Sequence, residues 1–150
     1  MKYISGLISK AHPVLTGCLA LSFFLFSNCG SDPEPETTRV RNLLTSGVWS
    51  VQTVTANGTD LTTVYKDLKL TFTEGGFTAS GGLPLWPATG TWTFPDDSAT
   101  KIKRGDNVVV TITAVEDKEL TYTLPWTQAT LGPGRVSSIN GDHVFVMVRP

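Results

Sequence analysis

The side chains able to do chemistry are few and scattered along this chain. His143 is the only histidine after residue 28, which excludes a metal site built on paired imidazoles in that part. The acidic stretches 96–97 and 116–119 offer oxygens to calcium, but their spacing matches no known calcium loop, and turns commonly collect acidic residues. No catalytic triad and no pair of carboxylates facing across a cleft is apparent. We therefore expect no metal, no cofactor and no enzymatic activity.

The two cysteines, Cys18 and Cys29, lie in or beside an apolar N-terminal segment. Residues 1–28 are typical of a secretion signal, with early lysines and an apolar run over 14–26 that is shorter than the ~20 residues of a membrane helix. The run ends in Phe-Ser-Asn-Cys, which resembles a bacterial lipobox and predicts a lipid on Cys29. Cys18 follows a tidier lipobox, but cleavage there would expose the apolar residues 19–26. An uncleaved anchor or an ordinary secretory cut is the alternative.

Residues 29–38 read as a lipidated cysteine followed by an acidic tether, in which Pro33 and Pro35 favour an extended chain. Gly30 follows the cysteine where an inner-membrane retention signal has aspartate. We therefore expect an outer-membrane lipoprotein of the cell envelope, on its periplasmic or its surface face. Without the leader, 10 basic residues stand against 13 acidic ones, a net charge of −3. No basic cluster is present, so nucleic acid is not an expected partner.

The remaining residues, 39–150, are dominated by the period-two alternation of β-strands. A helical turn or two is expected at 39–46, and a long irregular segment at 125–141. The connections are otherwise short, so successive strands are predicted to be antiparallel neighbours. The fold class is therefore all-β: a single up-and-down meander of about eight strands, closed as a barrel or flattened as a sandwich. The expected strands are 48–56, 67–73, 77–80, 89–94, 99–103, 107–114, 119–124 and 142–149.

A Gly-x-Trp sequence, Gly47-Val48-Trp49, follows the helical turn and opens the first strand. With Arg149 at the end of the last strand, it resembles the structural motif of lipocalins. The resemblance is to the compact lipocalin-like barrels of Gram-negative lipoproteins. It implies that Trp49 closes the floor of the barrel and that Arg149 packs over its ring as a cation–π contact. These residues are structural in that family, and they imply no binding site.

Aromatic residues in two loops are the best lead to a ligand. Trp86 lies in a Pro-rich apolar loop over 81–87, and Trp126 begins the irregular segment that also carries Arg135. Loops of this kind overhang one end of a small barrel, where the two rings would face a ligand and the arginine an anionic group. The alternative is that both rings fill the barrel end as core and that Arg135 is a solvated surface residue.

Two functions remain open from the sequence. The first is non-enzymatic binding of a small apolar or carbohydrate-like ligand, and the second is a structural or accessory module that contacts a protein partner. A hydrolase ranks third. The interior decides between the first two: an open pocket under Trp86 favours a ligand, and a solidly packed barrel favours the accessory role. The interior residues expected to fill a solid barrel are Leu68, Leu70, Phe72, Trp92, Val110, Ile112, Leu120 and Tyr122.

Overall fold

The computed structural model describes residues 33–127 and 139–150, which belong to one compact unit, Pro33–Pro150. One short helix precedes a sheet in which every strand pairs antiparallel with its neighbours. The elements are α1 (Glu36–Thr45), β1 (Val48–Ala56), β2 (Thr59–Asp60), β3 (Lys69–Phe72), β4 (Gly76–Ser80), β5 (Thr89–Thr93), β6 (Lys101–Arg104), β7 (Val109–Val115), β8 (Glu119–Trp126) and β9 (Gly141–Val148).

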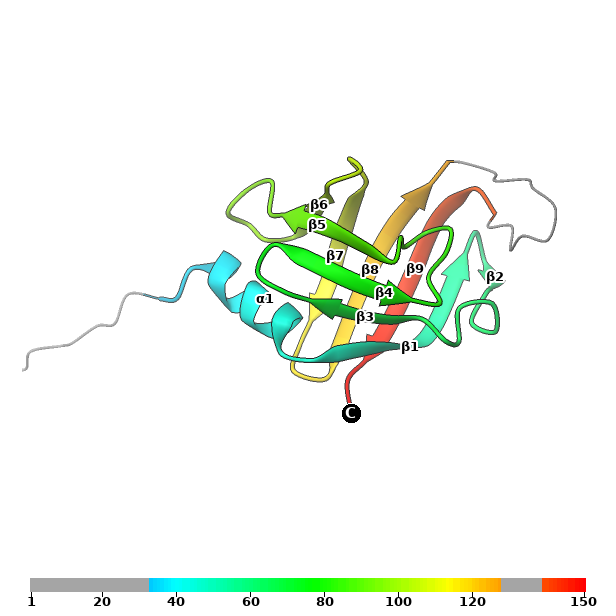
Figure 1. Ribbon diagram of the computed structural model, residues 1–150, viewed down its shortest axis with the longest axis horizontal. Coiled ribbons are helices and arrows are strands. Elements are labelled where there is room, and N and C mark those ends of the chain that lie inside the picture. The colour runs from blue at the N-terminus through cyan, green and yellow to red at the C-terminus, as the bar shows by residue number, and fades with distance from the viewer. Residues whose placement is uncertain (1–32, 128–138) are drawn as a thin grey trace, which may run out of the picture. The chain divides into compact units, whose positions relative to one another are not determined.

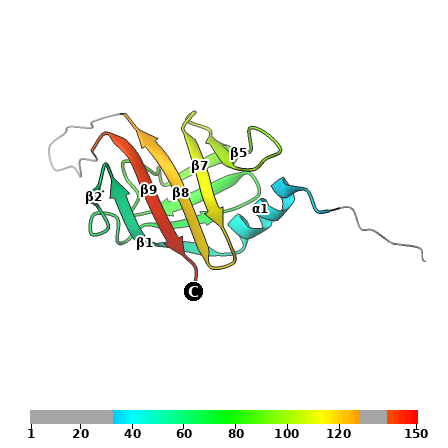
Figure 2. The same cartoon turned by 180° about the vertical axis from the view of Figure 1, so that it is seen from behind.

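The sheet closes on itself as an eight-stranded up-and-down barrel. From β3 to β9 each strand pairs with the next along the chain, and β1 pairs with both β3 and β9, for example through Val54 and Phe145. The two-residue β2 pairs only with β1 and extends it as a small hairpin. Figure 1 faces the wall formed by β3, β4 and β5, and Figure 2 faces the wall formed by β7, β8, β9 and β1. The predicted all-β fold class is confirmed. Of the two predicted forms, a closed barrel and a flattened sandwich, the structure is the closed barrel.

Alternation of side chains explains why these segments form a closed ring. In β8, for example, Leu120, Tyr122 and Leu124 are buried, while the residues between them are more exposed. In β7 the alternation changes phase after Ile112, because a bulge between Ile112 and Ala114 shifts the register. A second irregularity lies in β1. Bulges bend and twist strands, which helps a sheet of this size to close.

Of the strands, only β1 has the predicted bounds, and the short β2 was not predicted. Two of the differences, in β8 and β6, affect the residues discussed below. β8 continues to Trp126, with Pro125 paired to Asp142, although Pro125 was expected to begin an irregular segment. Proline is tolerated there because the pairing of β8 with β7 ends two residues earlier, at Thr123. β6 begins later and extends to Arg104, which was expected in the turn.

Helix α1 lies where a helical turn was predicted, but it starts at Glu36, three residues earlier than expected. The carbonyl of Pro35 accepts hydrogen bonds from the first turn, and the ring of Pro35 fixes the chain just before the helix. Val40 and Leu44 form the buried side of the helix and pack onto the core of the barrel. The helix therefore covers one end of the barrel (Figure 1).

Candidate functional site

In an up-and-down barrel the connections alternate between its two ends, so the chain order assigns each loop to one end. We call the first end, where α1 meets the start of β1, the helix end; it also holds the β3–β4, β5–β6 and β7–β8 turns and Arg149. The opposite end we call the loop end. It is formed by the connections over 57–68, 81–88 and 105–108, and by the residues on either side of the β8–β9 connection.

The predicted lipocalin-type motif is assembled at the helix end. The side chain of Trp49 is fully buried, and its indole Nε1 donates to the carbonyl of Leu44 at 2.9 Å. The guanidinium carbon of Arg149 lies 4.9 Å from the centre of the Trp49 ring, which is the expected cation–π contact. Gly47 leaves room for this side chain, because a Cβ there would lie 2.7 Å from Cδ of Arg149 and the arginine would have to move. The three residues therefore act as one structural unit that joins the helix to the barrel.

The interior is occupied by side chains. All eight residues expected to fill a solid barrel are buried, and additional core residues from other strands complete the filling. The aromatic rings contact one another through the interior at centroid separations between 4.9 and 6.4 Å. Most of these contacts are edge-on, Phe72 and Phe77 are tilted, and Tyr122 and Phe145 are stacked. The rings of this network are Phe72, Phe77, Trp86, Trp92, Tyr122 and Phe145.

Trp86 is a central member of this network. It is 1% exposed, and its ring makes edge-on contacts with Phe72, Phe77 and Tyr122. Its loop folds inward, with the amide of Trp86 donating to the carbonyl of Gly82 at 2.8 Å. Trp86 thus lies in the core, which is the alternative considered above, and turns no face toward a ligand. Burial raises the pKa of the neighbouring Tyr122 well above its ordinary value, so this phenol stays protonated.

Arg104 is the residue that the sequence analysis missed. It ends β6, and its side chain is only 2% exposed. Its guanidinium lies over Trp86 at 4.8 Å and near Phe77 at 5.8 Å. Nη1 donates to the carbonyl of Leu85 at 2.6 Å, while Nε and Nη2 donate to the two carboxylate oxygens of Asp106. A buried charge of this kind requires such partners, because an unpaired guanidinium would be costly to desolvate.

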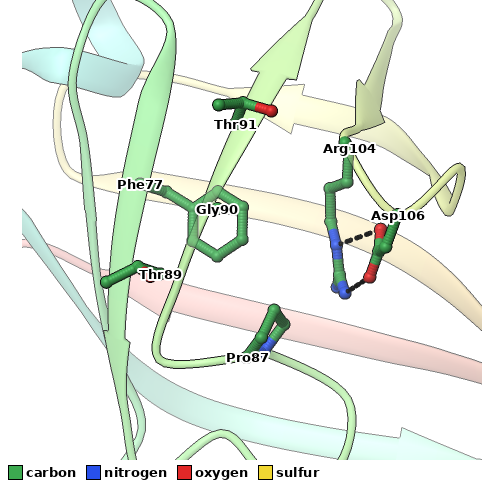
Figure 3. A pocket seen from close by; sticks show the side chains of 8 residues that line it. Phe77, Pro87, Thr89, Gly90, Thr91, Arg104 and Asp106 are labelled. Atoms are coloured by element: carbon green, nitrogen blue, oxygen red, sulfur yellow. Dashed lines mark hydrogen bonds and ion pairs between the residues drawn. The ribbon is translucent and has the colours of Figure 1, made fainter.

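Asp106 completes this pair from the β6–β7 turn. Its side chain is 46% exposed, so the carboxylate links the buried guanidinium to solvent. Burial raises the pKa of Asp106, but the hydrogen bonds and charge of Arg104 outweigh that effect and leave the pKa below its ordinary value. Figure 3 shows the two side chains parallel to each other, beside Pro87 and across from Thr89.

The Arg104–Asp106 pair stands where the barrel wall opens. β5 and β6 share only two register pairs, at Trp92 and Thr93, and the strands separate toward the loop end. The space between them is a hollow of about 470 Å³. Gly90 forms part of its wall, and a Cβ at that position would lie 2.6 Å from the Phe77 ring.

Two further hollows adjoin this one along the loop end. The second, of about 280 Å³, shares Pro87, Arg104 and Asp106 with the first. The third, of about 210 Å³, shares Pro125, Trp126 and Thr127 with the second. Because each shares lining residues with the next, the three hollows adjoin one another along the rim, and we call them together the rim groove.

Trp126 separates the second and third hollows. It is partly buried against the core, and its indole N–H has no hydrogen-bond partner among the described residues. The indole N–H of Trp86 is likewise without a hydrogen-bond partner in the described part of the chain, but Trp126 lines two of the three hollows and Trp86 lines none of them. Beyond Trp126, the third hollow is lined by Asn140 and Asp142.

The remaining polar candidates form no reactive group. His143 is fully buried, its Nδ1 lies 3.1 Å from the carbonyl of Gly141, and its ring contacts Tyr65 and Phe145. Asp96 accepts hydrogen bonds from the Ser98 amide and hydroxyl, and these lower its pKa. Over 33–127 and 139–150, no three metal-binding side chains lie close enough to hold an ion.

Two predicted site residues, Cys29 and Arg135, lie outside the described residues, so their roles stay predictions. In the described part, no helix is both long enough and apolar enough to cross a membrane. Comparisons of the chain with known protein families, with characterised proteins and with solved structures found no match.

Proposed function

We propose that this chain is a lipid-anchored, non-enzymatic barrel of the bacterial cell envelope that acts through its outer surface. The observation that carries this proposal is the filled interior, in which Trp86 and Tyr122 pack where a ligand would otherwise lie. Of the two functions left open by the sequence, this packing favours the accessory module in one respect, namely that recognition takes place on the outer surface of a filled barrel and not inside it. The alternative, an internal site for a small apolar ligand, has less support.

The energetic argument concerns what an internal ligand would displace. Burying one large apolar side chain contributes about 1.5–3 kcal/mol to the free energy of folding. If the rings of the aromatic network moved outward to admit a ligand, the protein would lose this contribution for several side chains. Typical ligand cavities measure roughly 300–1,000 Å³. At the loop end, the hollow of about 470 Å³ falls within this range of volumes. It lies in the opening between β5 and β6 and not inside the barrel. This placement supports recognition at the rim of the barrel.

The tether determines which surface is available. Seven residue steps separate Cys29 from the start of α1 at Glu36. A fully extended chain of that length spans at most about 25 Å. A lipid on Cys29 would therefore keep the helix end within about 25 Å of the bilayer, and it would leave the loop end, with its rim groove, free to face away from the membrane. The Gly47–Trp49–Arg149 unit supports a relationship to compact lipocalin-like lipoproteins.

The anchor is tested by feeding radioactive palmitate to bacteria that express the full chain. We expect label in the wild-type protein and in Cys18→Ala, and no label in Cys29→Ala. Cys18→Ala is the matched control, because it removes the other candidate cysteine and leaves the favoured lipobox intact. Label that depends on Cys18, or no label in any variant, would contradict the proposed anchor.

A further inference from the structure

We propose that the rim groove binds a neutral oligosaccharide, with Trp126 as the stacking surface and the Asp106 carboxylate, held in place by Arg104, as the hydroxyl-recognition group. This inference rests on the proposed function and names the class of partner that the exposed loop end takes. It depends on three features of the groove: its charge balance, its unused hydrogen-bonding capacity and its aromatic ridge.

The charge balance indicates a neutral ligand. Arg104, the cation that lines the first two hollows, is held by both carboxylate oxygens of Asp106. An anionic ligand would have to compete with Asp106 for this guanidinium, and it would also meet the carboxylate of Asp142 in the third hollow. A phosphate or a sulfated chain is therefore disfavoured.

The unused hydrogen-bonding capacity matches hydroxyl groups. Arg104 is buried and donates to Asp106 and Leu85, so it positions the carboxylate and is not itself in contact with a ligand. Asp106 retains acceptor capacity on its exposed carboxylate, which takes bonds from Arg104 and from the Val108 amide. The groove thus presents a fixed acceptor whose charge is already balanced by Arg104. A sugar hydroxyl can donate to this acceptor without bringing a charge of its own.

The aromatic ridge supplies the apolar part of the recognition. Trp126 borders two of the hollows, and its rigid ring is a platform for the C–H face of a pyranose. The groove continues on both sides of this ring, toward Arg104 in one direction and Asn140 in the other. A chain of several sugar units fits this arrangement better than a single sugar, because adjacent units can lie on either side of the ridge. A proline-rich peptide would also contact Trp126, but it lacks the hydroxyls that the polar pair favours.

The test uses the purified full chain in a detergent without a sugar headgroup, with binding followed by isothermal titration calorimetry. The probes are three neutral tetrasaccharides: β-1,4-linked glucose, β-1,4-linked N-acetylglucosamine and α-1,4-linked glucose. A proline-rich decapeptide serves as the competing ligand class. We expect saturable binding of at least one tetrasaccharide and none of the peptide. No binding by any of the three sugars, or binding of the peptide alone, would overturn the inference.

Variants assign the binding to the groove. Trp126→Ala should raise the dissociation constant by about tenfold or more, which is the effect of losing roughly one stacking contact. Asn140→Ala offers a second test that does not depend on removing a packed ring, because Asn140 is exposed; it should weaken binding measurably. Phe94→Ala is the control, since Phe94 is a partly buried ring beside a hollow at the helix end, and its removal should leave binding unchanged.

The outcomes separate this inference from the function on which it rests. Sugar binding that both groove variants leave unaffected would place the ligand elsewhere and overturn the groove assignment. Failure of all three sugars with a palmitate-labelled Cys29 would overturn only the ligand class. Loss of the palmitate label together with sugar binding at the groove would overturn the anchor and leave the groove standing.

Discussion

His143 is a weak base held in an environment that favours its neutral form. Its side chain is fully buried between Tyr65 and Phe145. Burial lowers the pKa of His143 below its ordinary value, although the Gly141 carbonyl and the charge of Asp142 partly offset this effect. The unfolded chain therefore takes up a proton at a higher pH than the folded chain does.

The first prediction follows from this difference in proton uptake. The free energy of unfolding should fall as the pH drops below about 6.5, because the unfolded histidine is protonated first, with a slope of at most about 1.4 kcal/mol per pH unit. The loss should end once the pH is below the lowered pKa of the folded protein. Urea unfolding across this range measures it, and His143→Gln should flatten the slope. An unchanged slope in the variant would contradict the assignment.

The burial of Arg104 and its pairing with Asp106 could not be predicted from the sequence. The stretch Arg104-Gly105-Asp106 has the composition of a turn, and the sequence analysis interpreted it as one. In the structure, the turn places Asp106 where it holds the guanidinium inward over Trp86. Such a pairing depends on a ring that lies 18 residues away in the chain, so local composition does not reveal it. Trp126 differs in that it lies beside a hollow, and its role as a ligand-facing residue stays a prediction.

At the scale of elements, α1 is attached to the barrel by one compact unit. Nη1 of Arg149 donates to the Leu43 carbonyl at 3.3 Å, and its guanidinium also lies over Trp49. The helix end is thus joined at the first and the last strand. Gly47 leaves the space through which the Arg149 side chain passes.

The second prediction is a double-mutant cycle on this attachment. Arg149→Ala and Gly47→Ala should each destabilise the protein by about 1–2 kcal/mol, because both remove the cation–π contact and the hydrogen bond to the helix. The double variant should lose little more than either single one, as coupled residues do. Gly75→Ala is the control, since a Cβ there meets nothing within 4 Å. Fully additive losses in chemical denaturation would contradict the coupling.

The strands were largely predictable because burial alternates along them. β1 has the bounds that its β-branched residues and the following Asn-Gly turn predict. Errors arose where another constraint overrides local pattern. Pro125 indicates a strand end, yet β8 continues because its partner on that side has already ended. The bulge after Ile112 shifts the inward phase by one residue, which the alternation of β7 alone does not reveal.

At the scale of the whole molecule, the proposed attachment and the proposed recognition involve opposite ends of the barrel. The helix end carries α1, which follows the proposed tether, while the loop end carries the rim groove. Between them lies an interior filled with aromatic and aliphatic side chains. Closure of β1 on β9 leaves unpaired edges only at the two-residue β2 and at the short opening between β5 and β6, which disfavours recognition by strand addition. The fold therefore directs function to the rim and the outer faces.

The filled interior is the claim on which this account depends most, and xenon tests it directly, because xenon enters dry apolar cavities. Crystals of the protein pressurised with xenon should show no bound atom within the ring of Phe72, Trp86 and Tyr122. Xenon density inside that ring would reveal an internal cavity, contradict the surface-acting barrel and restore the internal ligand site.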